Sequence, residues 1–227
     1  MSAILKDVII GDCRLILGDC LEVMPLLGEF DAVITDPPFG VGNFVQVTGN
    51  IRSKKVTWNK HIPNLIFFEK IKKISKHRIV WGANYFNCFE DKGGAIVWDK
   101  AQPMPDFSKA EIASCSHLKK TEMVKIPWTN FTARHKKESS HPCERPVSLY
   151  IWCVEYLPNP QTILDPYMGS GTTGVACVKL GRKFTGIELD PDYFDIACER
   201  IRKAYEQPDM FVQQPRKPIR LKQEDMF

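Results

Sequence analysis

Residues 161–190, QTILDPYMGSGTTGVACVKLGRKFTGIELD, predict a strand, a glycine turn, a helix and a second strand in direct succession. One apolar run ends at Asp165 and the other ends at Glu188, as expected for two buried strands. The turn Gly-Ser-Gly at 169–171 opens an apolar helix, for which Gly181 supplies a suitable C-terminal cap. Because a strand–helix–strand unit joins parallel strands, this stretch indicates an α/β fold.

The rest of the chain continues this alternation. Further strands are expected at 13–19, 31–39, 78–86 and 94–100, and further helices at 64–76, 147–157 and 191–206. We therefore expect a mostly parallel central sheet in one catalytic domain, residues 1–206. The segment 101–140 is rich in Lys, Ser, Thr and Pro, which indicates an insertion that does not serve core packing. Residues 207–227 are polar and contain proline, so we expect a flexible tail.

The composition is that of a soluble globular protein, since 44% of the 227 residues are hydrophobic and 26% are charged. No apolar run approaches the ~20 residues of a membrane helix, and the first residues lack the features of a signal peptide. We therefore expect a cytoplasmic protein with no membrane partner. The eight cysteines stand singly without a CxxC pair, which predicts buried reduced thiols and no metal site.

The net charge of +4 is mild, but the basic residues are concentrated in four stretches: 51–61, 117–125, 132–137 and 213–222. Such stretches form solvated loops in many proteins, and composition alone favours that interpretation. The alternative is contact with nucleic-acid phosphates, which Lys and Arg neutralise.

The glycine turn is expected at the carboxyl end of a strand, where α/β sheets bind ligands. Its glycines allow the backbone to approach a ligand, and the free N–H groups of the helix start favour a carboxylate or phosphate. Glu188, at the end of the next strand, is suited to accept hydrogen bonds from ribose hydroxyls. The stretch matches neither G-x-G-x-x-G nor a P-loop. It predicts a nucleoside ligand that carries a carboxylate, and the alternative is a tight turn with no ligand.

A second motif, TDPPFG, ends the apolar run at 31–39. The carboxylate of Asp36 and the carbonyl of Pro37 could each accept one N–H of a nucleobase amino group, which would free the lone pair of its nitrogen. The prolines fix φ and hold these acceptors in place. Phe39 offers a face on which a base taken out of its helix can stack. The alternative interpretation is a proline-stiffened strand end with a solvated Asp.

TDPPFG, LDPYMGSGTTGVA and HPCERP together resemble the S-adenosylmethionine-dependent DNA amino-methyltransferases of the permuted β group, over residues 10–205. In that group the catalytic motif precedes the target-recognition segment, and the cofactor turn comes last. The order is the same here, with 101–140 in the place of the target-recognition segment. The resemblance implies a Rossmann-like class I methyltransferase fold with a circularly permuted motif order. It also implies S-adenosyl-L-methionine as cofactor and double-stranded DNA as partner.

The resemblance also implies roles for individual residues. It implies a catalytic tetrapeptide of Asp36, Pro37, Pro38 and Phe39, where the family often has Tyr in the last position. The implied cofactor contacts are Asp165, Pro166, Met168, Gly169, Ser170, Gly171 and Thr172 around the methionine portion, Glu188 at the ribose, Asp19 with Cys20 at the adenine, and His141 and Arg145 near the cofactor carboxylate. The family usually writes the last segment HPTQKP, so Arg145 replaces Lys and Glu144 replaces Gln. A simple turn before the helix at 147–157 is the alternative for this segment.

The leading Asp of the catalytic motif favours the N6 amino group of adenine, because cytosine-N4 enzymes of this family more often begin with Ser. Cytosine N4 is the first alternative. An RNA or protein methyltransferase is less favoured, since those usually have Asn in first position and an unpermuted order. An inactive S-adenosylmethionine-binding DNA module is a further alternative. In a restriction–modification system, the nuclease would be another chain, because no D-x(n)-E-x-K cluster is present.

Partner contacts are expected from three regions. The loop at 41–60 is predicted to close over the flipped base and grip phosphates, and 101–140 to read base edges. Dimers are frequent in the group, so the resemblance makes a homodimer an expectation. It also implies a bacterial or phage protein. The near-repeat QPDMF at 207–211 and QEDMF at 223–227 resembles peptides that dock into the bacterial sliding clamp; the alternative is that Met210 and Phe211 pack on the domain.

Overall fold

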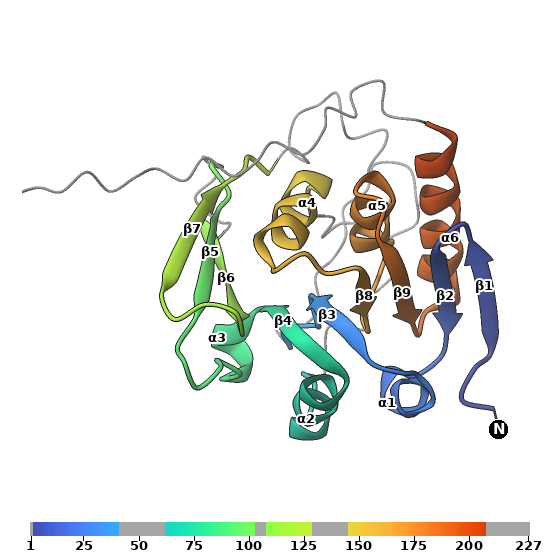
Figure 1. Cartoon of the computed structure of the whole chain (residues 1–227), viewed down its shortest axis with the longest axis horizontal. Coiled ribbons are helices and arrows are strands. Elements are labelled where there is room, and N and C mark those ends of the chain that lie inside the picture. Colours follow the sequence, from blue (N-terminus) through green and yellow to red (C-terminus); the bar gives the residue numbers. More distant parts are fainter. Residues whose placement is uncertain (1, 41–61, 103–107, 129–144, 208–227) are drawn as a thin grey trace, which may run out of the picture.

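The computed structural model describes residues 2–40, 62–102, 108–128 and 145–207. Nine strands form one sheet in the order β1-β2-β9-β8-β3-β4-β6-β5-β7, with helices on both faces (Figure 1). The strands are β1 (Lys6–Ile10), β2 (Cys13–Leu17), β3 (Phe30–Thr35), β4 (Ser75–Trp81), β5 (Ala95–Asp99), β6 (Ala110–Cys115), β7 (Thr121–Lys125), β8 (Thr162–Asp165) and β9 (Lys183–Glu188). The helices are α1 (Cys20–Val23), a 3₁₀ turn (Met24–Leu26), α2 (Leu65–Ile74), α3 (Ala83–Phe86), α4 (Val147–Tyr156), α5 (Thr172–Lys179) and α6 (Pro191–Glu206).

The middle of the sheet is parallel. Strands β2, β9, β8, β3 and β4 all run in one direction, while β1 is antiparallel to β2, and β6 is antiparallel to both β4 and β5. This arrangement confirms the predicted α/β fold with a mostly parallel sheet. Because parallel strands share one carboxyl edge, the ends of β3, β8 and β9 lie at the same edge of the sheet.

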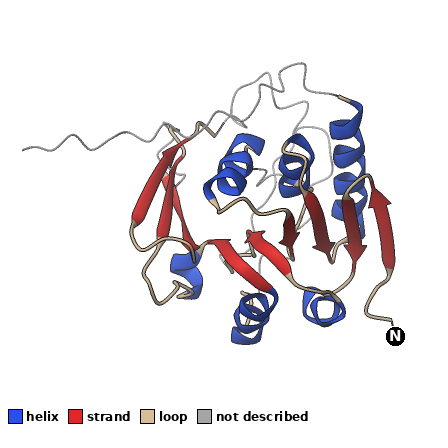
Figure 2. Cartoon of the chain, viewed as in Figure 1, coloured by secondary structure: helices blue, strands red, loops and turns tan. Residues whose placement is uncertain are grey.

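Two hydrophobic clusters hold the layers together. Helices α4, α5 and α6 cover one face of the sheet, and α1 and α2 cover the other (Figure 2). The first cluster includes Leu149 of α4 and Phe194 of α6, and the second includes Phe67 of α2. Fully burying such a side chain stabilises the fold by about 1.5–3 kcal/mol. None of the described helices is long and apolar enough to cross a membrane.

Local signals predict the starts of two helices, whereas the strand predicted at 78–86 ends at Trp81 and is followed by α3. Asn64 caps α2 by accepting a hydrogen bond from the Phe67 amide, and Pro191 lies in the first turn of α6. Gly181 follows α5 with a φ of +61°, as a C-terminal cap requires. Burial is confirmed for six of the predicted thiols: Cys13, Cys20, Cys115, Cys153, Cys177 and Cys198.

The segment 101–140 differs from its prediction. Residues 108–128 contain β6 and β7, which extend the main sheet, and Ala113, Cys115 and Val124 belong to the hydrophobic core. The expectation that this segment does not serve core packing is therefore wrong for residues 108–128. Residues 103–107 and 129–140 lie outside the described part of the chain, and the role of the segment in reading bases stays a prediction.

Candidate active site

The predicted catalytic motif and the predicted glycine turn meet at neighbouring strand ends. Asp36 follows β3 directly, and Asp165 is the last residue of β8, which pairs with β3 in parallel. The Thr35 hydroxyl donates a hydrogen bond of 2.8 Å to Asp165 Oδ1. Two motifs that are 130 residues apart in the chain are thus joined at the carboxyl edge of the sheet.

Asp165 uses both of its carboxylate oxygens within the protein. Oδ1 accepts from the Thr35 hydroxyl and from the Tyr167 amide at 3.1 Å, and Oδ2 accepts from the Thr173 hydroxyl at 2.6 Å. The side chain is buried. Burial raises the pKa of Asp165 to about 7, although the two hydroxyl donors oppose this shift.

Asp36 accepts a hydrogen bond from the described residues at one of its two carboxylate oxygens. Arg145 Nη2 donates to Asp36 Oδ1 at 2.6 Å, and no hydrogen bond from another described residue reaches Oδ2. The side chain retains 22% of its exposure. Burial raises the pKa of Asp36 to about 6, and the positive charge of Arg145 opposes this shift. Within the described part of the chain, Oδ2 therefore has no hydrogen-bond donor.

Arg145 connects Asp36 to two further buried charges. Its Nη2 also lies 2.8 Å from Glu111 Oε2 on β6, and Glu111 forms an ion pair with Lys100. The four groups alternate in sign from Asp36 to Lys100. Sequence reasoning missed Glu111 and Lys100, because neither belongs to a motif and only the tertiary fold brings them to Asp36. The predicted cofactor contact of Arg145 stays a prediction.

Phe39 is enclosed by aromatic rings and by Arg145. It stacks on Tyr85 with ring centroids 4.8 Å apart, and its edge meets Phe86 at 5.9 Å. The guanidinium carbon of Arg145 lies 5.7 Å from the Phe39 centroid. Gly82, with a φ of +77°, lies against the ring, since a Cβ there would stand 2.3 Å from Phe39 Cε1. Any base that stacks fully on the Tyr85 side of Phe39 must therefore displace Tyr85, which sequence reasoning did not single out.

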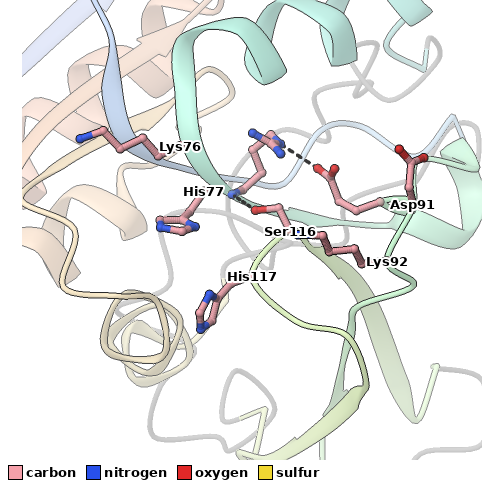
Figure 3. Close-up of a pocket in the computed structure, with 8 residues that line it drawn as sticks. Lys76, His77, Asp91, Lys92, Ser116 and His117 are labelled. Carbon is pink, nitrogen blue, oxygen red and sulfur yellow. Dashed lines mark hydrogen bonds and ion pairs between the residues drawn. The ribbon is translucent and has the colours of Figure 1, made fainter.

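A cavity of about 70 Å³ opens beside this ring. It is lined by Phe39, Gly82, Asn84, Tyr85, Ser108, Ala110, Glu111 and Ile112. A larger cavity of about 350 Å³ lies beside the first half of β4 and contains none of the predicted site residues (Figure 3). It is lined by Lys76, His77, Arg78, Glu90, Asp91, Lys92, Ser116 and His117.

Comparison with known proteins decides the family. Residues 30–199 match the model of the N6/N4 DNA methylase family. The chain belongs to this family. It is 27% identical to the putative methylase YubD of Escherichia coli over 83% of this chain and 89% of the relative. It is 22% identical to the type II methyltransferase M.HinfI of Haemophilus influenzae over 85% of this chain and 69% of the relative.

Solved structures share the fold of this DNA methyltransferase. The M1.HpyAVI–SAM complex superposes with a TM-score of 0.59 and 22% identity over 83% of this chain and 99% of the other. The cytosine-N4-specific PvuII DNA methyltransferase superposes with a TM-score of 0.62 and 17% identity over 89% and 94% of the two chains. The fold is that of the class I methyltransferases, and the family uses S-adenosylmethionine as methyl donor.

In the glycine turn of the methyltransferase, Gly169 has free space next to its backbone. A Cβ on Gly169 would meet no atom within 4 Å, and its φ of +52° favours glycine. Gly171, by contrast, packs against α6, where a Cβ would stand 2.9 Å from the Cβ of Ala197. Open space therefore adjoins the backbone at Gly169, as close approach of a cofactor requires.

Glu188 is tied to the same turn. Its Oε2 accepts from the Gly169 amide at 2.9 Å, and its Oε1 accepts from the amides of Leu189 and Asp190. Burial raises its pKa. The carboxylate and the glycine backbone hence form one unit, and a ligand at Gly169 would lie next to Glu188.

The remaining predicted residues lie around this unit with different surroundings. Arg200 donates to the Ser170 carbonyl and hydroxyl and to the Thr172 hydroxyl, so these side chains face α6. Asp19 caps α1 by accepting from the Leu21 amide at 2.7 Å. Four others are buried, namely Cys20, Pro37, Pro166 and Met168, while Pro38 is half-buried and His141 lies outside the described residues. In the described ranges, no three His, Cys, Asp or Glu side chains form a group that could hold a metal ion.

Proposed function

We propose that this DNA methyltransferase methylates the N6 amino group of adenine at a specific sequence in double-stranded DNA, after flipping the base out of the helix. The observation that carries this proposal is the pair of carboxylates at the ends of β3 and β8. Asp165 accepts hydrogen bonds at both oxygens, whereas Asp36 Oδ2 accepts none from the described residues and would take one from a substrate. Such an arrangement suits a planar base that carries an amino group.

Asp36 and Pro37 would activate the amino nitrogen. The lone pair of an exocyclic amine is delocalised into the ring, so the nitrogen is a poor nucleophile. Two acceptors that each take one N–H draw the nitrogen towards tetrahedral geometry, which localises the lone pair. Preorganised acceptors also stabilise the positive charge that develops on nitrogen during transfer. Asp36 must be ionised for this role.

When bound, S-adenosylmethionine would supply a methyl group on a positively charged sulfur: its carbon–sulfur bond would break to leave a neutral thioether, S-adenosylhomocysteine. The amino nitrogen would gain the methyl group and lose one proton to water, so no covalent enzyme intermediate is needed. Glu188 and the backbone of Gly169 would hold the cofactor, because the open space at Gly169 and the carboxylate of Glu188 adjoin each other. Asp19 and Cys20 would lie at its adenine.

Cytosine N4 is the second candidate. The two amino groups have the same chemistry, and a cytosine-N4-specific enzyme is among the proteins that share this fold. The leading Asp of the motif supports adenine. Phosphate contacts by 41–60 and clamp binding through Gln207–Phe211 or Gln223–Phe227 stay predictions, since these segments fall wholly or mostly outside the described residues. Site-specific recognition by 101–140 and a homodimer stay predictions as well. A cytoplasmic role in bacterial or phage restriction–modification is the setting in which this activity fits.

The decisive experiment follows a labelled methyl group from S-adenosylmethionine into unmethylated bacterial DNA, with nucleoside mass analysis and modification-sensitive sequencing. We expect N6-methyladenine in one sequence context. Matched reactions with RNA and with single-stranded DNA show whether the duplex is the substrate. N4-methylcytosine would retain the mechanism and refute the choice of base. Absence of label from DNA, with cofactor binding intact, would refute the proposed function.

A further inference from the structure

We propose that Arg145, Glu111 and Lys100 form a buried row of positioning residues that orients the Asp36 carboxylate and sets its charge state. This inference rests on the proposed function, because it assigns a role around the acceptor of that reaction. The three residues come from different parts of the fold. Arg145 immediately precedes the turn into α4, Glu111 lies on β6, and Lys100 follows β5.

The geometry of the row is continuous. Arg145 Nη2 lies 2.6 Å from Asp36 Oδ1 and 2.8 Å from Glu111 Oε2, and Lys100 completes the row on the same Glu111 carboxylate. The side chains of Arg145, Glu111 and Lys100 retain 9%, 13% and 7% of their exposure. Buried charges are costly unless opposite charges compensate them, so each member requires its neighbour. Arg is suited to this position since it does not deprotonate in proteins.

The far end of the row is fixed by aromatic rings. The Lys100 ammonium lies 5.4 Å from the Trp98 ring centroid and 4.8 Å from that of Trp128. The Lys100 backbone bonds to Lys109 and Trp128. The strands β5, β6 and β7 thereby hold the row, and through it they hold a carboxylate that belongs to the parallel part of the sheet.

Because the charges alternate, each one acts on Asp36 with a defined sign. Arg145 and Lys100 lower the pKa of Asp36, and Glu111 raises it. Two other titratable groups adjoin Asp36: Tyr150 on α4 and Asp165 on β8. Methyl transfer needs ionised Asp36, so activity is lost as pH falls through its pKa of about 6. Removing a positive member should move this acidic limb to higher pH, and removing Glu111 should move it to lower pH.

The test is the pH dependence of single-turnover methyl transfer to DNA, with S-adenosylmethionine affinity measured alongside. Arg145→Met should raise the acidic midpoint by about one to three pH units. Lys100→Met should raise it by less, and Glu111→Gln should lower it. Arg145→Lys should restore most of the wild-type profile. If Arg145→Met does not fold, the opposite signs for Lys100→Met and Glu111→Gln still decide the matter.

A matched control lies in the larger cavity. Arg78 and Glu90 form a pair of 2.7 Å whose side chains retain 13% and 16% of their exposure, close to the values in the row. Arg78→Met should lower thermal stability as a row variant does, without moving the acidic limb. This comparison separates loss of a buried ion pair from loss of control over Asp36.

A second readout does not depend on methyl transfer. Carboxyl carbon NMR, with the Asp36 signal assigned by its absence in Asp36→Asn, follows the titration of Asp36 in the protein without DNA. Absence of methyl transfer by the wild type, with Asp36 shifts of alternating sign, refutes the proposed function and supports the row. The proposed role of the row is overturned if the Asp36 titration midpoint is unchanged in Arg145→Met, Lys100→Met and Glu111→Gln. It is also overturned if all three variants shift this midpoint in the same direction. A weaker cofactor affinity of Arg145→Met with an unmoved midpoint overturns it in favour of a cofactor contact.

Discussion

Asp36 and Asp165 stand at the ends of neighbouring parallel strands, yet the protein treats them differently. Both are shielded from water, and burial raises the pKa of each. Asp165 accepts hydrogen bonds from two hydroxyls and an amide. Among the described residues, Asp36 accepts a hydrogen bond from the Arg145 guanidinium alone, at Oδ1. Both oxygens of Asp165 accept hydrogen bonds within the protein. Asp36 has a positively charged partner at Oδ1, and Oδ2 accepts no hydrogen bond from the described residues.

The difference shows how one sheet edge can hold a structural carboxylate and a reactive one. Hydroxyl donors such as Thr35 and Thr173 satisfy a carboxylate without a counter-charge, so it can gain a proton near neutral pH without losing its place. A guanidinium favours the charged form and leaves a free lone pair. The distinction depends on the donors that surround each residue, and not on the strand ends themselves.

The largest expected effect is that of Asp36→Ala. Because this change removes the acceptor that we propose to activate the amino group, we expect methyl transfer to fall by about a thousandfold or more. The affinity for S-adenosylmethionine, measured by calorimetry, should stay within about threefold, since no hydrogen bond joins Asp36 to the turn at 169–171. Near-normal turnover of this variant would show that the two carboxylates have been assigned the wrong roles.

Glu188→Ala extends the comparison to a third carboxylate, which is held by backbone amides. Its loss frees the Gly169 amide and removes the acceptor that we propose for the cofactor ribose. We expect the affinity for S-adenosylmethionine to fall by about tenfold to a hundredfold, as for loss of a hydrogen bond to a charged group. Turnover at saturating cofactor should change much less. Calorimetry and saturation kinetics measure the two quantities, and a fall in turnover alone would contradict this assignment.

Asp165→Asn sharpens the comparison through pH. The pKa of Asp165 is about 7 in the folded protein, against about 3.9 in an unfolded chain. Protonated Asp165 therefore contributes its full share to the free energy of unfolding at pH values below about 3.9. This contribution is lost as the pH rises through about 7. We expect the fall in thermal stability between about pH 5 and about pH 8 to be smaller in Asp165→Asn than in the wild type. An unchanged slope would show that Asp165 does not titrate in this range.

The smallest effect is expected at Phe39. Phe39→Tyr adds only a hydroxyl and keeps the stacking face, so methyl transfer should change by less than about threefold. Phe39→Ala removes the ring that packs on Tyr85 and Gly82, and transfer should fall by about tenfold or more. Fluorescence of a 2-aminopurine placed at the target position would report base flipping in both variants. Equal losses in Tyr and Ala variants would argue against stacking on this ring.

The elements with strong local signals could be predicted from the sequence. Helix α6 has both its capping residue and its amphipathic pattern in the sequence, and its predicted limits agree with Pro191–Glu206. Strands β1 and β7 were not predicted because they form the two edges of the sheet and bury few side chains. The edges leave little hydrophobic signal, as the exposed residues of KDVII and TEMVK show.

The same limit applies to the site. Asp36, Asp165 and Gly169 stand in short motifs whose chemistry can be inferred before the fold is known. Glu111 reaches Arg145 only because β6 pairs in antiparallel fashion with β4, and β4 is the neighbour of β3, the strand that ends before Asp36. Such a contact depends on strand register and helix docking, which no local pattern encodes.

The hydrogen bond between Thr35 and Asp165 has a consequence for the synthesis of the protein. Its partners are 130 residues apart, so a ribosome that has produced Asp36 must continue through most of the chain before β8 can pair with β3. A nascent chain then holds the acceptor without the glycine turn, and it has no means to bring a methyl donor to DNA. Methylation can begin only after the chain between Thr35 and Asp165 has folded and β8 has paired with β3. Activity is therefore expected to appear late in folding.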